Sequence, residues 1–310
     1  MNSIYEHGAW TSQIYKETAL IVLSLLFISG LIVYFLRKKN YYFIVSWASL
    51  KSWLILAPVL FLLFGFPEPW PLIFITLFAI QGAKSFFQIM GMYHRSYFVI
   101  ICYAGIMGLA ASIYFDRLDI YNISPMIVFG TACLVPLLRN NYVKMIQYIS
   151  LTNLAFVFLG WSFMHLALLL KLQNGVYQVM YLLILTEFCD NTTLAISLYI
   201  GSKRIFNNID HRRTIGGFAV SVIITLFVAG AMRQLLPDRS EIYWLTSGLA
   251  SSFGGLFGDM VMDVIRRDAG IRTLGAFVLG RGDFLHRMDR LIFVAPIYYY
   301  IMLYLQGHIA

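Results

Sequence analysis

The sequence predicts an all-α fold, a polytopic bundle of about nine to ten transmembrane helices with both termini outside. Hydrophobic residues make up 60% of the 310 positions and charged residues only 12%, proportions that exclude an ordinary soluble core. Apolar runs long enough to cross a membrane recur through the chain, and lysine and arginine gather in alternate connections between them. We therefore expect one integral-membrane domain over residues 1–310.

Each apolar segment is expected to be a helix, and several are at the short end of the spanning range of roughly 17–25 residues. The first, residues 19–36, lacks the basic n-region and the small-residue cleavage site of a signal peptide, so we interpret it as a membrane anchor. Residues 41–52 are expected to lie along the membrane interface before the second segment. The remaining segments are residues 53–66, 72–90, 97–114, 123–138, 149–170, 177–200, 215–235, 243–264 and 291–305.

The positions of lysine and arginine predict the orientation of the chain. With the N-terminus outside, the basic residues of the outer segments are few, namely Lys16, Arg117, Lys171, Arg233 and Arg239. The inner loops then hold the clusters at residues 37–39, 203–213 and 266–290. We expect an integral protein of a bacterial cytoplasmic membrane. The net charge of +8 is explained by this arrangement, so nucleic acid is not an expected partner.

The stretch 254–291 differs from the rest of the chain because it is dense in charge and glycine. A helix would place four of its residues on one face, since they fall at i, i+4, i+7 and i+8: Asp259, Asp263, Arg266 and Arg267. Carboxylates that hold a hard cation, beside guanidiniums that clamp phosphate, are typical of phosphoryl or nucleotidyl transfer sites. The plain alternative is a basic loop beside a membrane helix. The interleaved carboxylates favour a site.

The spacing of this stretch resembles the C-terminal motif of the phosphatidate cytidylyltransferases, or CDP-diacylglycerol synthases. That motif begins with Gly-Asp-Leu, matched here by Gly258-Asp259-Met260, and continues with Ser-x-x-Lys-Arg, matched by residues 263–267. Its last three elements are Gly-x-Lys-Asp, Pro-Gly-His-Gly-Gly and Asp-Arg-x-Asp, and residues 270–273, 279–283 and 286–289 take their places without a gap. This chain departs from the motif where Asp263 replaces the serine and where Thr273 and His286 replace aspartates.

The resemblance implies a reaction in which the phosphate of phosphatidate, or of a related lipid phosphate, attacks the α-phosphorus of CTP and releases pyrophosphate. It implies Mg²⁺ or another divalent cation, Mn²⁺ included, held by Asp259 and Asp289, with His286 as a further candidate ligand. Asp283, a carboxylate that the family's motif lacks, is another candidate and would restore the charge lost at His286. Because imidazole suits transition metals better than Mg²⁺, His286 would favour Mn²⁺. The arginines expected to clamp phosphate groups are Arg266, Arg267, Arg272 and Arg287. Gly280 and Gly282 would let backbone N–H groups approach phosphate.

A second candidate feature begins in the segment 177–200, so we expect residues 177–310 to carry the whole nucleotide and metal site. Glu187 and Asp190 are three residues apart and share a helical face. Asp190 is matched to an aspartate of the family, and the alternative is a buried carboxylate paired with a lysine or arginine of a neighbouring helix. Residues 210–217 take the place of the family's Ser-Pro-x-Lys-Thr-x-Glu-Gly. There Gly216 replaces the glutamate. A helix beginning near Arg212, Arg213 and Thr214 could receive a phosphate; the alternative, which this stretch taken alone favours, is the ordinary basic flank of a membrane helix.

Three classes of function remain open from the sequence. The first is a metal-dependent cytidylyltransferase with CTP and a membrane lipid phosphate as substrates. The second is a family member without catalysis, because Thr273, His286 and Gly216 each remove a carboxylate from the motif. The third is a transporter or flippase with Glu187 and Asp190 on its pathway. A homodimer is compatible with all three classes.

Overall fold

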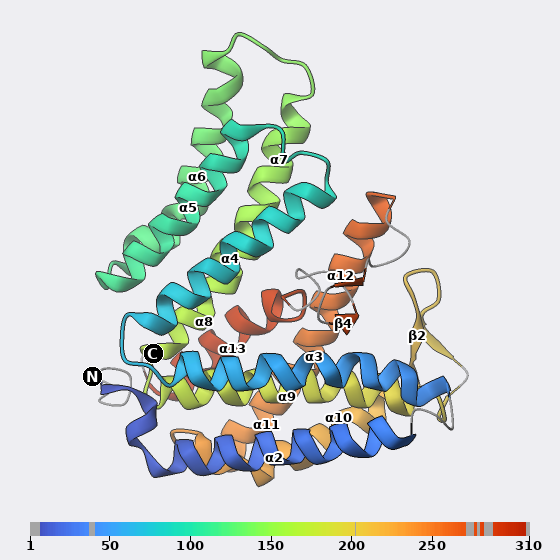
Figure 1. Cartoon of the computed structure of the whole chain (residues 1–310). Helices are drawn as coiled ribbons and strands as arrows, with labels where there is room; N and C mark the ends of the chain where they lie inside the picture. Colours follow the sequence, from blue (N-terminus) through green and yellow to red (C-terminus); the bar gives the residue numbers. More distant parts are fainter. Residues whose placement is uncertain are drawn as a thin grey trace. The chain divides into compact units, whose positions relative to one another are not determined.

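The computed structural model describes residues 7–36, 41–201, 203–270, 276–277, 280–281 and 288–307 (Figure 1). Within these residues the fold is helical, with two short antiparallel hairpins. Six described helices are long and apolar enough to cross a membrane, and three shorter apolar helices cover Trp53–Phe64, Ile215–Ala231 and Leu291–Leu305. The prediction of an all-α fold is thus confirmed, and the length and composition of these helices indicate an integral membrane protein. The total of nine to ten spans stays a prediction.

The chain divides into two compact units, each made of segments that are distant in sequence. The first unit contains residues 1–71, 170–248 and 272–283. In it α2 packs beside α3, and α9 packs beside α10; Figure 1 shows α2 and α3 running alongside each other. Its helices and strands are η1 Ala9–Thr11, α2 Gln13–Leu36, α3 Tyr41–Phe64, α9 Gly175–Ile196, β1 Arg204–Phe206, β2 Asp210–Thr214, α10 Ile215–Ala231, η3 Arg233–Leu235, α11 Glu241–Leu249, β3 Ala276–Phe277 and β4 Gly280–Arg281.

Tyrosine hydroxyls hold the start of the chain against the first unit. The hydroxyl of Tyr15 donates to the carbonyl oxygen of Phe61 at 2.6 Å, and the hydroxyl of Tyr177 donates to Ser12 Oγ at 2.6 Å. These contacts connect α2 with α3, and the segment before α2 with α9. Such pairing is required because a buried hydroxyl without a partner is costly in an apolar surrounding.

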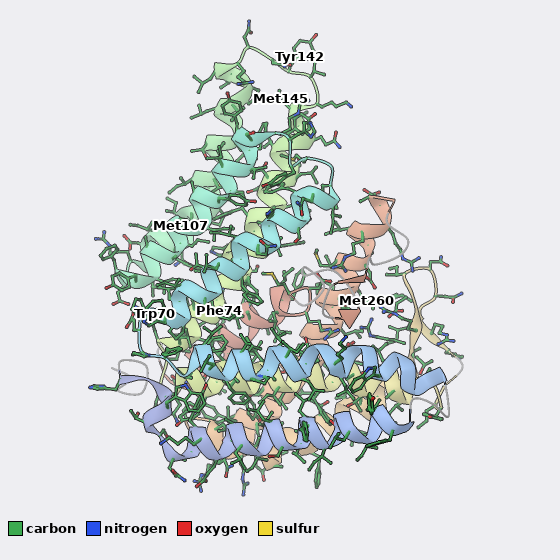
Figure 2. The ribbon with its side chains drawn as sticks, in the orientation of Figure 1. Trp70, Phe74, Met107, Tyr142, Met145 and Met260 are labelled. Atoms are coloured by element: carbon green, nitrogen blue, oxygen red, sulfur yellow. The ribbon has the colours of Figure 1, made fainter. Side chains whose placement is uncertain are left out.

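The second unit contains residues 72–169, 249–271 and 284–310. In it α5 packs against α6 and α7, and α13 packs against α12 and η4. Figure 2 shows Tyr142 at the connection between α6 and α7, with Met145 at the start of α7. The unit's helices are α4 Trp70–Ile89, which begins at its boundary, α5 Ser96–Tyr114, α6 Leu118–Leu138, α7 Met145–Ala155, η2 Phe156–Ser162, α8 Phe163–Leu170, η4 Ala250–Gly254, α12 Gly255–Asp268 and α13 Leu291–Leu305.

All ten apolar segments fall on described helices, and α13 has the predicted bounds. Residues 41–52 form one helix with the segment that follows them, α3 from Tyr41 to Phe64 with Pro58 inside it, and their position along the membrane interface stays a prediction. The predicted segments 149–170 and 243–264 each contain a stretch of π-helix, η2 and η4. Such stretches are rare and occur frequently at functional sites. The second of them leads directly into α12, which carries the first motif residues.

Candidate functional site

The register of α12 places most of the predicted polar face inside the second unit. Asp259 is completely buried and Arg266 is 3% exposed, while Asp263 is partly buried one turn before Arg266. Arg267 is exposed, so it does not share this environment. Figure 2 marks Met260, the neighbour of Asp259 on α12. The predicted common face is confirmed for three of its four members.

The absence of a side chain at Gly258 allows α12 to touch the segment before α13. A Cβ atom at Gly258 would overlap the carbonyl oxygen of Asp289, and it would lie 3.1 Å from both the Cα and the carbonyl oxygen of Arg290. The glycine of the first motif element is therefore in backbone contact with the last element. This contact carries Asp259 and Asp289, which are 30 positions apart in the sequence, into one buried cluster.

Arg266 lies at the centre of this cluster. Its Nη2 donates to Asp289 Oδ2, and its Nη1 donates to Asp263 Oδ1 at 3.4 Å. Burial acts to lower the pKa of the guanidinium, but the charges of Asp289, Asp263 and Asp259 outweigh this effect and raise its pKa above the ordinary value. Arg266 is therefore a cation that is paired with Asp289 and Asp263 and feels the charge of Asp259. We name Asp259, Asp263, Arg266 and Asp289 the α12 cluster.

The α12 cluster has the ligand chemistry of a hard cation site but not a complete site among the described residues. The cluster has three carboxylates and one guanidinium. The carboxylates remain in excess when the guanidinium of the buried neighbour Arg290 is added. Mg²⁺ is commonly bound by one or two carboxylates, with substrate phosphates and waters as its other ligands. In the described part of the chain no group of three or more His, Cys, Asp and Glu side chains is placed to hold a metal. Asp259 and Asp289, both completely buried, give the cluster two such carboxylates.

A second buried ion cluster lies in the first unit, around Arg213. Its Nε donates to Asp190 Oδ1 at 3.1 Å, its Nη2 donates to the same oxygen, and its Nη1 donates to Asp210 Oδ2 at 2.5 Å. Asp190 is on α9, whereas Asp210 and Arg213 are on β2. The predicted alternative for Asp190, a buried carboxylate paired with a basic residue, is confirmed, although that residue comes from a strand and not from a helix.

Asp210 also holds its neighbour Arg212. The backbone N–H of Arg212 donates to Asp210 Oδ1 at 2.8 Å, and its Nε donates to the same atom at 3.1 Å. Burial acts to raise the pKa of Asp210, but Arg213 and Arg212 outweigh it, so the pKa lies below its ordinary value. The Arg212 side chain remains 41% exposed, whereas that of Arg213 is 2% exposed. Of the two arginines expected to receive a phosphate, only Arg212 has a substantially exposed side chain.

Thr214 is the N-cap of α10, as predicted for a helix start at this position. Its Oγ1 accepts from the N–H of Gly217 at 3.0 Å and donates to the carbonyl oxygen of Ile200 at 2.7 Å. A Cβ at Gly217 would lie 2.9 Å from both the N and Cα atoms of Ser197. The end of α9 and the start of α10 are thus in backbone contact, and the hydroxyl of Thr214 is engaged within the protein.

Most of the predicted residues of the glycine-rich stretch lie outside the described residues. Gly280 is an exception: it pairs with Phe277 in the β3–β4 hairpin, which packs against α3. Outside the described residues lie Arg272, Thr273, Gly282, Asp283, His286 and Arg287. The prediction missed Asp210 as a partner of Arg213 and Arg290 as a buried cation. The alternation of acidic and basic residues at 210–213 was a usable signal for the first, whereas the burial of Arg290 follows only from the approach of α12.

The fold and these clusters define a helical membrane protein with buried carboxylate–guanidinium groups. A model of the cytidylyltransferase family matches residues 47–305, and the chain belongs to this family. The resemblance read from the motif is thereby confirmed, as a distant homology to phosphatidate cytidylyltransferases.

Individual relatives agree with this membership. The chain is 31% identical over 158 residues to the uncharacterized protein YnbB of Escherichia coli K12, which covers 48% of this chain and 53% of the relative. It is 26% identical over 153 residues to a phosphatidate cytidylyltransferase of Bacillus subtilis, and the match covers 48% of this chain and 56% of the relative. It is 24% identical over 161 residues to a phosphatidate cytidylyltransferase of Staphylococcus aureus, and the match covers 51% of this chain and 60% of the relative. The chain spans about half the length of the curated relatives it matches.

Proposed function

We propose that this protein transfers the cytidylyl group of CTP to phosphatidate or a related lipid phosphate, and that the α12 cluster is its active site. The observation that carries the proposal is the contact of Gly258 with Asp289 and Arg290. It joins the first and last elements of the motif around one buried guanidinium. The family membership and the named relatives support the reaction class.

The chemistry requires little from a general base, because the attacking lipid phosphate is already an anion. The work is to reduce the repulsion between two polyanions and to hold the leaving pyrophosphate. Asp259 and Asp289 would hold a divalent cation, which supplies the positive charge for the triphosphate. Arg266 is paired with Asp289 in the structure. Arg267, exposed at the end of the same helix, would contact the outer phosphates.

The proposal is tested with detergent-purified protein, phosphatidate, CTP and Mg²⁺ or Mn²⁺, by measuring CDP-lipid with mass spectrometry. Wild-type protein is expected to form the product. Asp259→Asn and Asp289→Asn should each lower the rate at least about 100-fold, since each removes charge stabilisation from the reaction centre.

The matched control is Asp268→Asn, which changes an exposed carboxylate at the end of the same helix. This variant should keep the wild-type rate. If wild-type protein makes no CDP-lipid with either cation, the protein is a family member without this activity. If Asp268→Asn loses as much rate as Asp259→Asn, the loss does not come from the α12 cluster.

We further propose that both termini lie outside and that the β1–β2 hairpin faces the cytoplasm, where CTP is present. The charge bias of the loops supports this orientation. In intact cells, an impermeant thiol reagent added from outside should label Asp238→Cys and leave Asn207→Cys unlabelled. Both positions are exposed in connections between helices. Labelling of Asn207→Cys alone would mean that the orientation is reversed.

A further inference from the structure

We infer that Arg266 moves from Asp289 to Asp263 when a divalent cation binds Asp259 and Asp289, and that Asp263 is the positioning residue that receives it. This inference rests on the proposed function, because it concerns the cation of that site. Nothing in the reaction itself requires a carboxylate at position 263. Its role must therefore come from the side chains that surround it.

The geometry gives Arg266 two acceptors on two different elements. Its Nη2 is paired with Asp289, which precedes α13, and its Nη1 reaches Asp263, one turn earlier on its own helix. Charge-assisted N–H···O bonds are normally about 2.7–2.9 Å long. The Arg266–Asp263 distance of 3.4 Å is therefore that of a contact only partly formed. A rotation of the Arg266 side chain towards Asp263 is the movement that we infer.

The charges of the cluster provide the reason for such a movement. A divalent cation on Asp259 and Asp289 would stand beside the guanidinium in a site from which water is excluded, where repulsion between like charges is strong. Arg266 would then lose the acceptor that it now has in Asp289. Through Asp263, which it already contacts, the guanidinium stays paired. Three carboxylates then face one guanidinium and one divalent cation, so the formal charges of the four side chains and the ion cancel.

Burial gives the movement a direction. The side chain of Asp289 is completely buried, whereas that of Asp263 is 13% exposed. Arg266 would thus shift towards the more solvated carboxylate. Its Nε, which is buried and has no hydrogen-bond partner among the described residues, adds to the cost of the present position.

The competing interpretation is that Asp263 is itself a ligand of the cation. The two ideas separate in a double-mutant cycle of Asp263→Asn and Arg266→Gln, with Mn²⁺ alone as the probe. Free Mn²⁺ is measured by electron paramagnetic resonance with purified protein, without CTP or lipid. We expect Asp263→Asn to weaken Mn²⁺ binding about ten-fold. In this variant Arg266 has no second carboxylate to pair with when the cation displaces it from Asp289.

Arg266→Gln is expected to bind Mn²⁺ at least as tightly as wild-type protein, because the competing charge is gone. In that background Asp263→Asn should change the affinity by less than about three-fold. An equal loss in both backgrounds would make Asp263 a ligand or a general source of negative charge and would overturn the inference. Weaker binding in Arg266→Gln would overturn it too, since Arg266 would then assist the cation.

Arg266→Lys serves if the glutamine variant does not fold, because it keeps the charge but loses the fork that joins two carboxylates. Asp263→Asn should then weaken binding by less than it does beside arginine, and an undiminished loss would contradict the inference.

Asp268→Asn is the control for surface charge and should leave the affinity unchanged. Absence of Mn²⁺ binding to wild-type protein would refute the inference. The predicted pattern of binding in a protein that makes no CDP-lipid would refute only the proposed function.

Discussion

Gly258→Ala is expected to abolish the proposed activity and to lower the stability of the protein by about 1–3 kcal/mol or more. The new methyl group would overlap the carbonyl oxygen of Asp289 and lie 3.1 Å from Arg290 Cα. These are backbone atoms, so no side-chain rotation can make room. The segment before α13 would have to move away from α12, which separates Asp289 from Asp259 and Arg266.

Thermal unfolding in detergent measures this effect through a thiol-reactive dye, because Cys102 and Cys189 are buried and react when the protein opens. The control is Gly130→Ala, at an exposed position of α6 where a Cβ meets nothing within 4 Å. We expect the control to be neutral or slightly stabilising, since alanine favours a helix over glycine. Equal stability of the two variants would mean that α12 is not held against the segment before α13.

Arg213→Met is expected to destabilise the first unit by about 3–5 kcal/mol, because it leaves two buried carboxylates without their common cation. Asp190 is 9% and Asp210 3% exposed, so water cannot replace the guanidinium. Methionine keeps most of the side-chain volume, and the loss is therefore electrostatic. Arg212→Met is the matched control on the same strand, with a side chain that is 41% exposed. Its expected effect is about 0–1 kcal/mol.

The difference in stability against unfolding between wild-type protein and Arg213→Met should depend on pH. The pKa of Asp210 is lowered in the folded protein, so the folded state binds this proton less readily than the unfolded chain does. The resulting stabilisation is complete above the ordinary aspartate pKa of about 3.9 and is lost as the pH falls through the lower native value. The unfolding temperatures of the two proteins should therefore converge in strong acid. A difference that grows on acidification would contradict the assigned ion pairs.

The helices were predictable because their composition is imposed by the membrane. A segment such as 291–305 has no alternative to a helix in an apolar surrounding, and α13 begins and ends where the sequence indicated. The continuity of α3 was not predictable from the same pattern, because Lys51 resembles an end of a span while the backbone continues through it. The π-helical stretch at 250–254 depends on packing and leaves no signature in hydrophobicity.

The residues of the α12 cluster were predictable, but their partners were not. Spacing placed Asp259, Asp263 and Arg266 on one face, and the structure confirms this. It did not reveal that Arg266 is an internal counter-ion of Asp289, because that pairing depends on a contact between elements 23 residues apart. The same holds for Arg213, which the sequence assigned to a phosphate and the structure pairs with Asp190.

The fate of the label from CTP tests the proposed reaction most directly. Purified protein is incubated with phosphatidate and a divalent cation, and with CTP carrying ³²P at either the α or the γ position. Cytidylyl transfer predicts that the α label enters the lipid fraction and the γ label leaves as pyrophosphate, with both transfers lost in Asp289→Asn. Entry of the γ label into lipid would show phosphoryl transfer, and label from neither position in lipid would show that this protein does not catalyse the reaction; either result would contradict the proposed function.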